Sequence, residues 1–403
     1  MERGNKMNIL IAPDSFKGSL SAQEFCDISE KSILKVYPNA NIKKIPMADG
    51  GEGTVESLVF NTGGKILYQD VTGPLGNKVT AAFGILGDGS TAVVEMANAS
   101  GLPLVPKEKR NPMYTTTYGT GELIKTALDQ GCTRLIMGIG GSATNDGGAG
   151  MLQALGFKLL NAKGESIPFG AKGLLELESI EMSEKDPRLD EVEIRVACDV
   201  DNPLYGPKGA SYVYGPQKGA TEEMLPLLDQ GLQRFHDCIQ RFLGKEVAHI
   251  PGAGAAGGLG AGLLAFLNGD LESGFTIIQK EIGLERILET HKFDLVITGE
   301  GQMNDQTLYG KLPVGIAGVA KKYNLPVIAF VGSIGKGAEQ VYEAGIDSII
   351  SIADGPMSLE YSMANGSVLL EKAVERFMRT IYALNKAWLK FFEQVLDELS
   401  KDN

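Results

Sequence analysis

Short apolar runs alternate with amphipathic stretches at both ends of the chain. Residues 8–12 and 41–47 are predicted strands, and each is followed by a loop and then by a helix, the first from Ser21 and the second from Thr54. Ser21 and Glu24 have the spacing of a capping box, which supports the start of the first helix. The same alternation returns in three further segments in the last third of the chain. Repeated strand, loop and helix units are typical of a parallel α/β sheet.

The middle of the chain has a different pattern. Between about 65 and 97, short alternating runs are separated by the turn sequences GPLGNK and GDGS, which favour β-hairpins and a mixed or antiparallel sheet. The sequence therefore predicts an α/β fold with a discontinuous Rossmann-like parallel-sheet domain, residues 1–65 plus 286–403. A second α/β domain containing a mixed sheet is predicted as an insertion at 66–285. In such a fold we expect the ligand in a cleft between the domains.

Charge and cysteine content narrow the class of protein. The 403 residues include 50 acidic and 38 basic side chains, so the net charge of −12 argues against a nucleic-acid partner. The four cysteines are far apart and form no CxxC pair, which indicates reduced thiols in the cytosol. The first residues contain neither a signal peptide nor a membrane span. We expect a cytoplasmic protein that acts on small molecules, with no membrane or nucleic-acid partner; a homodimer is left open.

A bare backbone segment is the strongest chemical signal. Residues 139–151, IGGSATNDGGAGM, hold five glycines between an apolar strand and an apolar helix. Such a junction exposes N–H groups at the start of a helix, which favours an anion such as phosphate. Asp146 could cap this helix or hold a metal ion or a substrate hydroxyl. The other candidates for binding substrate or phosphate here are Gly140, Gly141, Ser142, Thr144 and Asn145.

Polar residues also follow several other predicted strands. In open α/β sheets ligands bind at the carboxyl ends of the strands. Acids that recur there beside glycines favour binding of Mg²⁺ and hydroxyl groups, although each one alone could be a turn residue. A lysine in such a loop could meet a phosphate or simply be solvated. The candidates at these strand ends are Asp14, Ser15, Lys17, Asp49, Asp199, Glu300 and Gln306. Lys311, at the start of a predicted helix, could contact a phosphate or a carboxylate or could be solvated.

Other common site motifs are missing, and one alternative remains. The chain has no GxxxxGK[ST] loop, no HExxH pair and no GxSxG elbow, and its three histidines lack metal-binding spacing. The stretch GAGAAG, Gly252 to Gly257, matches a dinucleotide fingerprint, with Glu272 about 20 residues further on. EVAHI before it could be a short strand. An NAD-dependent oxidoreductase is therefore an alternative function, and tight packing of the glycines is an alternative role.

Several long motifs together resemble a known family. PDSFKGSLSA, ADGGEGT, GIGGSATNDGGAGM, ACDVDNPL and GPQKGA occur in this order, and the resemblance, to the two-domain bacterial glycerate kinase family, runs from about Met7 to about 380. It implies ATP-dependent phosphorylation of D-glycerate with Mg²⁺. The expected product is 2-phosphoglycerate, and 3-phosphoglycerate is the alternative. It also implies two α/β domains with the active site between them.

The positions of the motifs and their chemistry suggest roles for particular residues. Lys17 is assigned to phosphate charge, and Asp199 to Mg²⁺ or to accepting the glycerate hydroxyl proton; Asp146 is a second candidate metal ligand. One departure matters, because Gln302 and Asn304 stand where the family usually has Arg and Asp. An amide cannot act as a base. A non-catalytic protein that binds small acids is therefore a further alternative.

Overall fold

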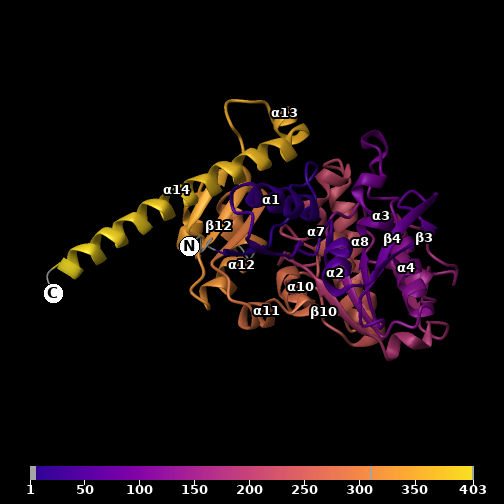
Figure 1. Cartoon of the computed structure of the whole chain (residues 1–403). Helices are drawn as coiled ribbons and strands as arrows, with labels where there is room; N and C mark the ends of the chain where they lie inside the picture. The colour runs from indigo at the N-terminus through magenta and orange to yellow at the C-terminus, as the bar shows by residue number, and fades with distance from the viewer. Residues whose placement is uncertain (1–5, 309–310, 402–403) are drawn as a thin grey trace. The chain divides into compact units, whose positions relative to one another are not determined.

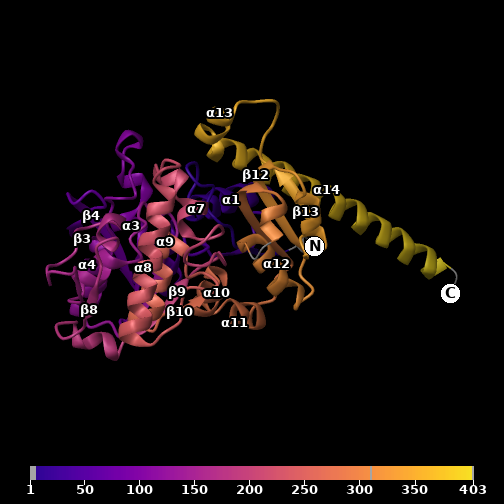
Figure 2. The same cartoon turned by 180° about the vertical axis from the view of Figure 1, so that it is seen from behind.

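A computed structural model of the chain describes residues 6–308 and 311–401. It divides into two compact units, the first made of Met1–Met47 with Leu284–Asn403 and the second of Ala48–Gly283. Each unit has its own sheet and helices (Figures 1 and 2). The domain boundaries expected at 65/66 and 285/286 stay a prediction.

The first unit is built on a fully parallel five-stranded sheet from both ends of the chain, as predicted. Its order is β13 (Ser348–Ser351), β12 (Val327–Ile334), β11 (Leu295–Met303), β1 (Asn8–Ile11) and β2 (Asn41–Lys44). The register is set by pairs such as Ile9 with Leu295 and Val296 with Val327. β2 ends at Lys44, short of the predicted residue 47. Pro46 has no N–H and cannot donate to a strand ladder there.

Helices cover both faces of this sheet. α1 (Ala22–Val36) and α14 (Gly366–Lys401) share a hydrophobic core with one face, and α12 (Leu312–Lys321) packs against β11 and β12 (Figures 1 and 2). The capping box at the start of α1 is confirmed, because Ser21 and Glu24 exchange hydrogen bonds with each other's backbone N–H. α11 (Leu284–Thr290) and α13 (Leu359–Ala364) are the shorter helices of this unit.

The second unit contains the predicted mixed sheet. Its order is β10 (Asp270–Glu272), β9 (Glu193–Ala197), β6 (Arg134–Gly138), β5 (Thr91–Glu95), β4 (Lys78–Ile85) and β3 (Lys65–Thr72). β10, β9, β6 and β5 run parallel, whereas β3 and β4 form the antiparallel hairpin edge. A small separate hairpin joins β7 (Lys158–Leu160) to β8 (Ser179–Glu181). The α/β fold class with a mixed second sheet is therefore confirmed.

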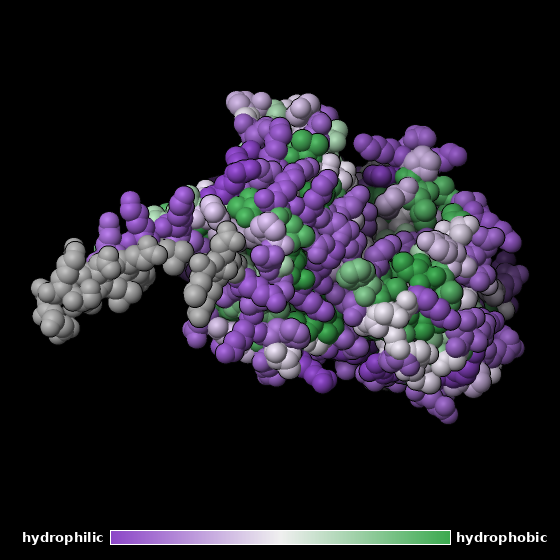
Figure 3. Space-filling model, viewed as in Figure 1, coloured by the Kyte–Doolittle hydropathy of each residue, from purple (hydrophilic) through white to green (hydrophobic). Residues whose placement is uncertain are grey.

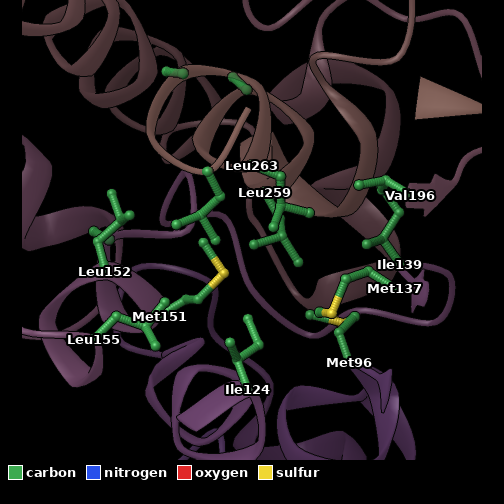
Figure 4. Packing of buried hydrophobic residues seen from close by; sticks show 14 of the residues in the cluster. Met96, Ile124, Met137, Ile139, Met151, Leu152, Leu155, Val196, Leu259 and Leu263 are labelled. Carbon is green, nitrogen blue, oxygen red and sulfur yellow. The ribbon is translucent and has the colours of Figure 1, made fainter. Parts of the chain in front are cut away.

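One large core lies against a face of this mixed sheet. The helices that pack there are α4 (Tyr118–Asp129), α5 (Ala149–Ala154), α8 (Leu225–Leu243) and α9 (Ala255–Phe266). Figure 4 shows Met137 of β6 and Met96, which directly follows β5, in one cluster with Met151, Leu259 and Leu263 from the helices. α2 (Thr54–Thr62) and α10 (Gly274–Ile282) contact each other as well as strands of the sheet. The other short helices are α3 (Ala97–Ser100), α6 (Ala171–Leu174) and α7 (Ala210–Tyr214).

The visible surface is mainly hydrophilic, with separate hydrophobic patches (Figure 3). Within the described parts of the chain, no helix is both long and apolar enough to cross a bilayer.

Candidate functional site

The parallel strands of the second unit bring several candidate residues to one edge. β5, β6, β9 and β10 end together, so the segments after Glu95, Gly138, Ala197 and Glu272 share that edge. The loop before α2 lies on the same edge: a methyl group on Gly50 would come within 2.4 Å of the Ala197 Cβ. Loops at the carboxyl ends of parallel strands are where α/β proteins bind ligands.

The glycine loop after β6 has an exposed part and a buried part. Gly140 and Gly141 are exposed, whereas residues 142–150 are buried. Gly141 has a φ of 74°, a conformation that glycine adopts without strain. A methyl group on Gly140 would lie 3.3 Å from the Gly51 Cα, so another backbone segment runs close by. Only the first two glycines therefore present open backbone to solvent.

Asp146 lies in the buried part, surrounded by donors. Its carboxylate accepts hydrogen bonds from the N–H and hydroxyl of Thr117, both at 2.9 Å, and from the N–H groups of Gly148 at 3.2 Å and Gly150 at 3.3 Å. Burial raises the pKa of this carboxyl, while the four donors oppose that rise. The arrangement favours the capping interpretation of Asp146 over the metal-binding one.

Ser142, Thr144 and Asn145 are also buried, and they hold the loop to the rest of the unit. The Asn145 amide donates to the Ser211 hydroxyl at 3.1 Å. The carbonyl of Thr144 accepts a 2.7 Å hydrogen bond from the Lys218 ammonium. Ser142 forms an isolated β-bridge with Gly101. These three contacts, two of them through the backbone, hold the buried part of the loop in place.

Asp49 and Asp199 lie at the open edge. Asp199 follows β9 and is exposed, and its carboxylate accepts a 3.0 Å hydrogen bond from the N–H of Gly274 at the start of α10. Asp49 accepts a hydrogen bond from the Gly51 N–H at 3.1 Å. A methyl group on Gly274 would come within 1.9 Å of the Asp49 carbonyl oxygen, so the two loops touch. The second unit thus gathers Asp49, Asp199 and the exposed glycines on one edge.

Glu95 is a residue at this edge that the sequence analysis missed. It ends β5 and is only 4% exposed, and its carboxylate accepts a 2.8 Å hydrogen bond from the Val55 N–H in the first turn of α2. Burial raises its pKa to about 7, and the nearby charges of Glu52 and Glu56 act in the same direction. The available signal was an acid at the end of an otherwise apolar strand, VVE.

The first unit gathers a second group of candidates after β1. The N–H of Asp14 donates to the Gly299 carbonyl at 2.9 Å, which joins this loop to β11. The Asp14 carboxylate is buried and accepts the Ser15 N–H at 2.7 Å. The Ser15 hydroxyl is buried and has no hydrogen-bond partner among the residues that the structure describes. Lys17 is exposed and lies three residues after Asp14.

Glu300 lies within β11 and is the centre of a small network. It is buried, and its carboxylate accepts a 2.7 Å hydrogen bond from the Thr307 hydroxyl. The Lys311 ammonium lies 4.0 Å from its other oxygen. Gln306, between them in sequence, is exposed. The structure therefore brings the side chains of Glu300 and Lys311 together.

The residues that depart from the family pattern form a turn. The side-chain oxygen of Asn304 accepts a 2.9 Å hydrogen bond from the Gln306 N–H, and the Asn304 N–H donates to the Thr307 hydroxyl at 3.1 Å. This turn starts the short 3₁₀ helix Asp305–Leu308. An aspartate could accept the same hydrogen bond. Gln302 is exposed, and its position in the strand pairs with Ser333 of β12.

The structure does not support a dinucleotide site at GAGAAG. The preceding EVAHI is not a strand, which corrects the expectation, and Glu272 pairs with Arg195 at 2.7 Å. Methyl groups on Gly254 and Gly257 would come within 2.2 and 2.0 Å of other backbone carbonyl oxygens. These glycines therefore serve close packing, the second interpretation of the motif.

The acids at the strand ends can be compared with what Mg²⁺ requires. Among the residues that the structure describes, no three His, Cys, Asp or Glu side chains form a cluster able to hold a metal ion. Mg²⁺ is commonly bound through one or two carboxylates together with substrate phosphates. The exposed carboxylate of Asp199 fits this mode of binding, since it lies at the open edge.

Nearly the whole chain is similar to known proteins. The model of the glycerate kinase family matches residues 9–382. A glycerate kinase from Halalkalibacterium halodurans is 53% identical over 379 residues, 94% of this chain and 99% of that protein. A glycerate 2-kinase from Escherichia coli K12 is 53% identical over 346 residues, 86% of this chain and 90% of that protein.

A solved structure is also similar. It is that of a protein from Salmonella typhimurium LT2 described as a candidate glycerate kinase 2, with 47% sequence identity and a TM-score of 0.84. The match covers 95% of this chain and 100% of that one.

Proposed function

This chain belongs to the glycerate kinase family, and we propose that it transfers the γ-phosphoryl group of ATP to D-glycerate, with Mg²⁺, to give 2-phosphoglycerate. The choice of hydroxyl follows the relative from Escherichia coli that is named glycerate 2-kinase. The observation that carries the proposal is the open edge of the second unit. There, bare backbone and two carboxylates lie where a parallel sheet binds its ligands.

Phosphoryl transfer depends mainly on positioning and on neutralising charge. In the reaction, the 2-hydroxyl oxygen of glycerate bonds to the γ-phosphorus, and the bond from that phosphorus to the bridging oxygen breaks, so that ADP leaves. The hydroxyl proton passes to a base. We assign the N–H groups of Gly140 and Gly141 to the phosphate oxygens, because exposed backbone donors suit an anion.

Asp199 is our candidate for the proton-accepting group. It is exposed, and its hydrogen bond from the Gly274 N–H holds one carboxylate oxygen in place. The same carboxylate suits Mg²⁺, which would supply positive charge to the phosphate groups. We propose Asp49 as a second polar group at this edge.

In the first unit we propose that Lys17 and Lys311 bind anionic groups of the substrates, with Asp14, Ser15, Glu300 and Gln306 as further contacts. A lysine is a point charge that suits phosphate or carboxylate. The Glu300 carboxylate lies 4.0 Å from the Lys311 ammonium and would orient it.

A coupled assay tests the proposal. Purified protein is mixed with ATP, Mg²⁺ and D-glycerate, and enolase is added, which dehydrates 2-phosphoglycerate but not 3-phosphoglycerate. We expect a rise in absorbance from phosphoenolpyruvate that needs all three reagents. If a mutase must be added before the signal appears, 3-phosphoglycerate is the product. If ADP does not form at all, the protein is not a glycerate kinase.

Substitution at Asp199 tests the assigned base. Asp199→Asn keeps an acceptor for the Gly274 N–H but cannot take a proton. We expect kcat to fall by about 100-fold or more, the usual scale for loss of a general base. Asp201→Asn, two residues further on and also exposed, is the matched control and should stay near wild type. Equal rates for the two variants would remove Asp199 from this role.

A further inference from the structure

Lys218 is a buried lysine to which the proposed reaction assigns no role. Its side chain is only 2% exposed, and it ends the 3₁₀ helix Pro216–Lys218. Lysine is almost never fully buried unless it is paired. Its ammonium donates a 2.7 Å hydrogen bond to the Thr144 carbonyl, inside the glycine loop. The buried cation thus points at the backbone of the loop that we propose binds phosphate.

The surroundings of Lys218 disfavour its charge. Burial lowers its pKa to about 7, and the charge of Asp146 opposes this shift. An apolar side chain of similar length would fill this space without the cost of removing an ammonium from water. Stability alone is therefore a poor explanation for a lysine here.

The segment that carries Lys218 holds the loop at two adjacent residues. Lys218 binds the carbonyl of Thr144, and Ser211 in α7 accepts a 3.1 Å hydrogen bond from the side-chain amide of Asn145. A few residues later, the N–H of Gly147 donates to the Gly257 carbonyl at 3.0 Å. The buried half of the loop is thus attached to two separate segments of the unit.

The exposed half of the loop is attached on its other side. The Gly141 carbonyl accepts the Leu102 N–H at 2.8 Å, and the Ala143 N–H donates to the Ser100 carbonyl at 3.0 Å. Thr144 is the next residue. The bond from Lys218 therefore lies immediately after this backbone bridge, where it can set the direction of the peptide groups leading back to Gly141.

We propose that Lys218 is a positioning residue for phosphoryl transfer: by holding the Thr144 carbonyl, its ammonium keeps the exposed N–H groups of Gly140 and Gly141 aimed at the phosphate. The inference rests on the proposed function, because it concerns the same loop. Lys218 itself does not contact the substrates. Donors that are already aligned before the reaction stabilise the transition state more than donors that must reorient.

Lys245 offers a matched control in the same unit. Its ammonium also donates to a backbone carbonyl, that of Ala265 at 2.7 Å, and to the Asn268 side chain at 2.7 Å. Burial lowers its pKa as well. Lys245 attaches the end of α9 rather than the glycine loop. Lys218→Met and Lys245→Met each remove one such ammonium, so only the first should change the proposed site.

The first measurement follows the loop itself, without substrate. Hydrogen–deuterium exchange is compared in peptides spanning residues 139–150. We expect exchange in this segment to rise by about tenfold in Lys218→Met and to stay at the wild-type rate in Lys245→Met, since local opening rises when a holding contact is lost. Unchanged exchange in Lys218→Met would overturn the inference whether or not the protein is a glycerate kinase.

The second measurement follows catalysis. For Lys218→Met we expect kcat to fall by about tenfold or more, with KM for glycerate within about threefold, because misaligned donors act mainly on the transition state. Lys245→Met should keep kcat within about twofold. An active wild type with an unaffected Lys218→Met overturns the inference and leaves the proposed function standing. An inactive wild type removes the proposed function, and the exchange measurement then decides about the loop.

A conservative variant guards against loss of folding. Lys218→Arg keeps a cation and N–H donors at this position. We expect its kcat to lie between those of the wild type and Lys218→Met. If Lys218→Met does not fold, Lys218→Gln, whose shorter side chain lacks the ammonium, is measured in the same two ways. Wild-type exchange together with wild-type kcat in a folded Lys218→Gln would overturn the inference.

Discussion

Two glycine-rich segments of the second unit look alike in sequence and differ in the structure. Residues 138–150 follow β6 and leave Gly140 and Gly141 open to solvent, whereas all the glycines of 252–262 are buried. The first segment lies at the carboxyl end of a parallel strand. The second lies in and before α9, where its left-handed residues 256–258 turn the backbone inside the core.

The difference separates two uses of a missing side chain. In the first segment the absence of a Cβ leaves N–H groups accessible to a ligand. In the second it lets backbones touch, and Gly257 lies directly against the Thr144 carbonyl of the first segment. The buried glycines therefore support the exposed ones. Substitution in the buried segment, 252–262, should mainly affect stability. Substitution of the exposed glycines of 138–150 should mainly affect activity.

The largest expected effect is that of Gly257→Ala. The new methyl group would come within 2.0 Å of the Thr144 carbonyl oxygen, and the φ of 70° strains any residue with a Cβ. Backbone cannot move aside as a side chain can, so we expect a loss of about 4 kcal/mol or more in the free energy of unfolding. Urea denaturation followed by circular dichroism measures it.

The control for that substitution is Gly318→Ala in α12. Within the described part of the chain, a methyl group on Gly318 would meet no other segment within 4 Å, and the residue lies in a helix with ordinary backbone angles. Alanine should stabilise this helix by about 0.5–1 kcal/mol. If both substitutions change stability by similar small amounts, then the 252–262 segment does not act as a tight support.

The second expected effect concerns the first turn of α2, where the buried Glu95 carboxylate accepts the Val55 N–H. Burial raises the pKa of Glu95 from 4.5 to about 7. The folded state therefore holds this proton more tightly than the unfolded state. The stability that this gives is complete below about pH 4.5 and is lost as the pH rises through about 7. Glu95→Gln has no titratable group at this position, so its stability lacks this pH dependence.

The measurement compares the two proteins at two pH values. Between about pH 5 and pH 8, the wild type should lose about 2 kcal/mol of unfolding free energy relative to Glu95→Gln. Urea unfolding at both pH values gives this difference. If the unfolding free energies of the two proteins change in parallel with pH, then the pKa of Glu95 is not raised in the folded state.

Helix caps and the residues that follow parallel strands could be predicted from the sequence, because both depend on positions along the chain. The capping box of Ser21 and Glu24 is a local pattern, and its hydrogen bonds are present. That Gly140 and Asp199 lie on one edge follows from the rule that parallel strands end together. Asp49 instead follows β2 of the other sheet and reaches this edge because its loop packs against Ala197 and Gly274. Their roles in binding and catalysis stay predictions.

Burial of charged groups could not be predicted in this way. Nothing in GPQKGA distinguishes the buried Lys218 from the lysines on the surface, because its environment is made by loops distant in sequence. The same holds for Glu95, which is enclosed only once α2 packs beside β5. EVAHI resembled a strand, but the following glycines pack against the backbone of other loops, so no ladder forms there.

Gly140→Ala sharpens the comparison from the exposed side. A methyl group there would come closest to the Gly51 Cα, at 3.3 Å, and Gly140 lies outside the left-handed region that disfavours alanine. Unfolding free energy should change by less than about 1 kcal/mol. In contrast, kcat should fall by about tenfold, because a shifted peptide moves a donor that we propose binds the phosphate in the transition state. Denaturation and the enolase-coupled assay together measure both effects, and a full rate would place the phosphate elsewhere.

The smallest effect is expected in the first unit, where a side chain rather than a glycine shapes the loop after β11. Asn304→Asp keeps an oxygen that can accept the Gln306 N–H, so the turn into the 3₁₀ helix should persist. We expect unfolding free energy to change by less than about 0.5 kcal/mol and kcat/KM by less than about threefold.

Gln302→Arg is added to restore the whole family pattern. Steady-state kinetics of the single and double variants decide the outcome: a rise of about tenfold in kcat would mean that the two amides limit the enzyme, since such a rise corresponds to about 1.4 kcal/mol of transition-state stabilisation. A rate near wild type would mean that the loop after β11 needs only a hydrogen-bond acceptor at position 304. A side chain would then hold this loop, as buried glycines support the loop after β6.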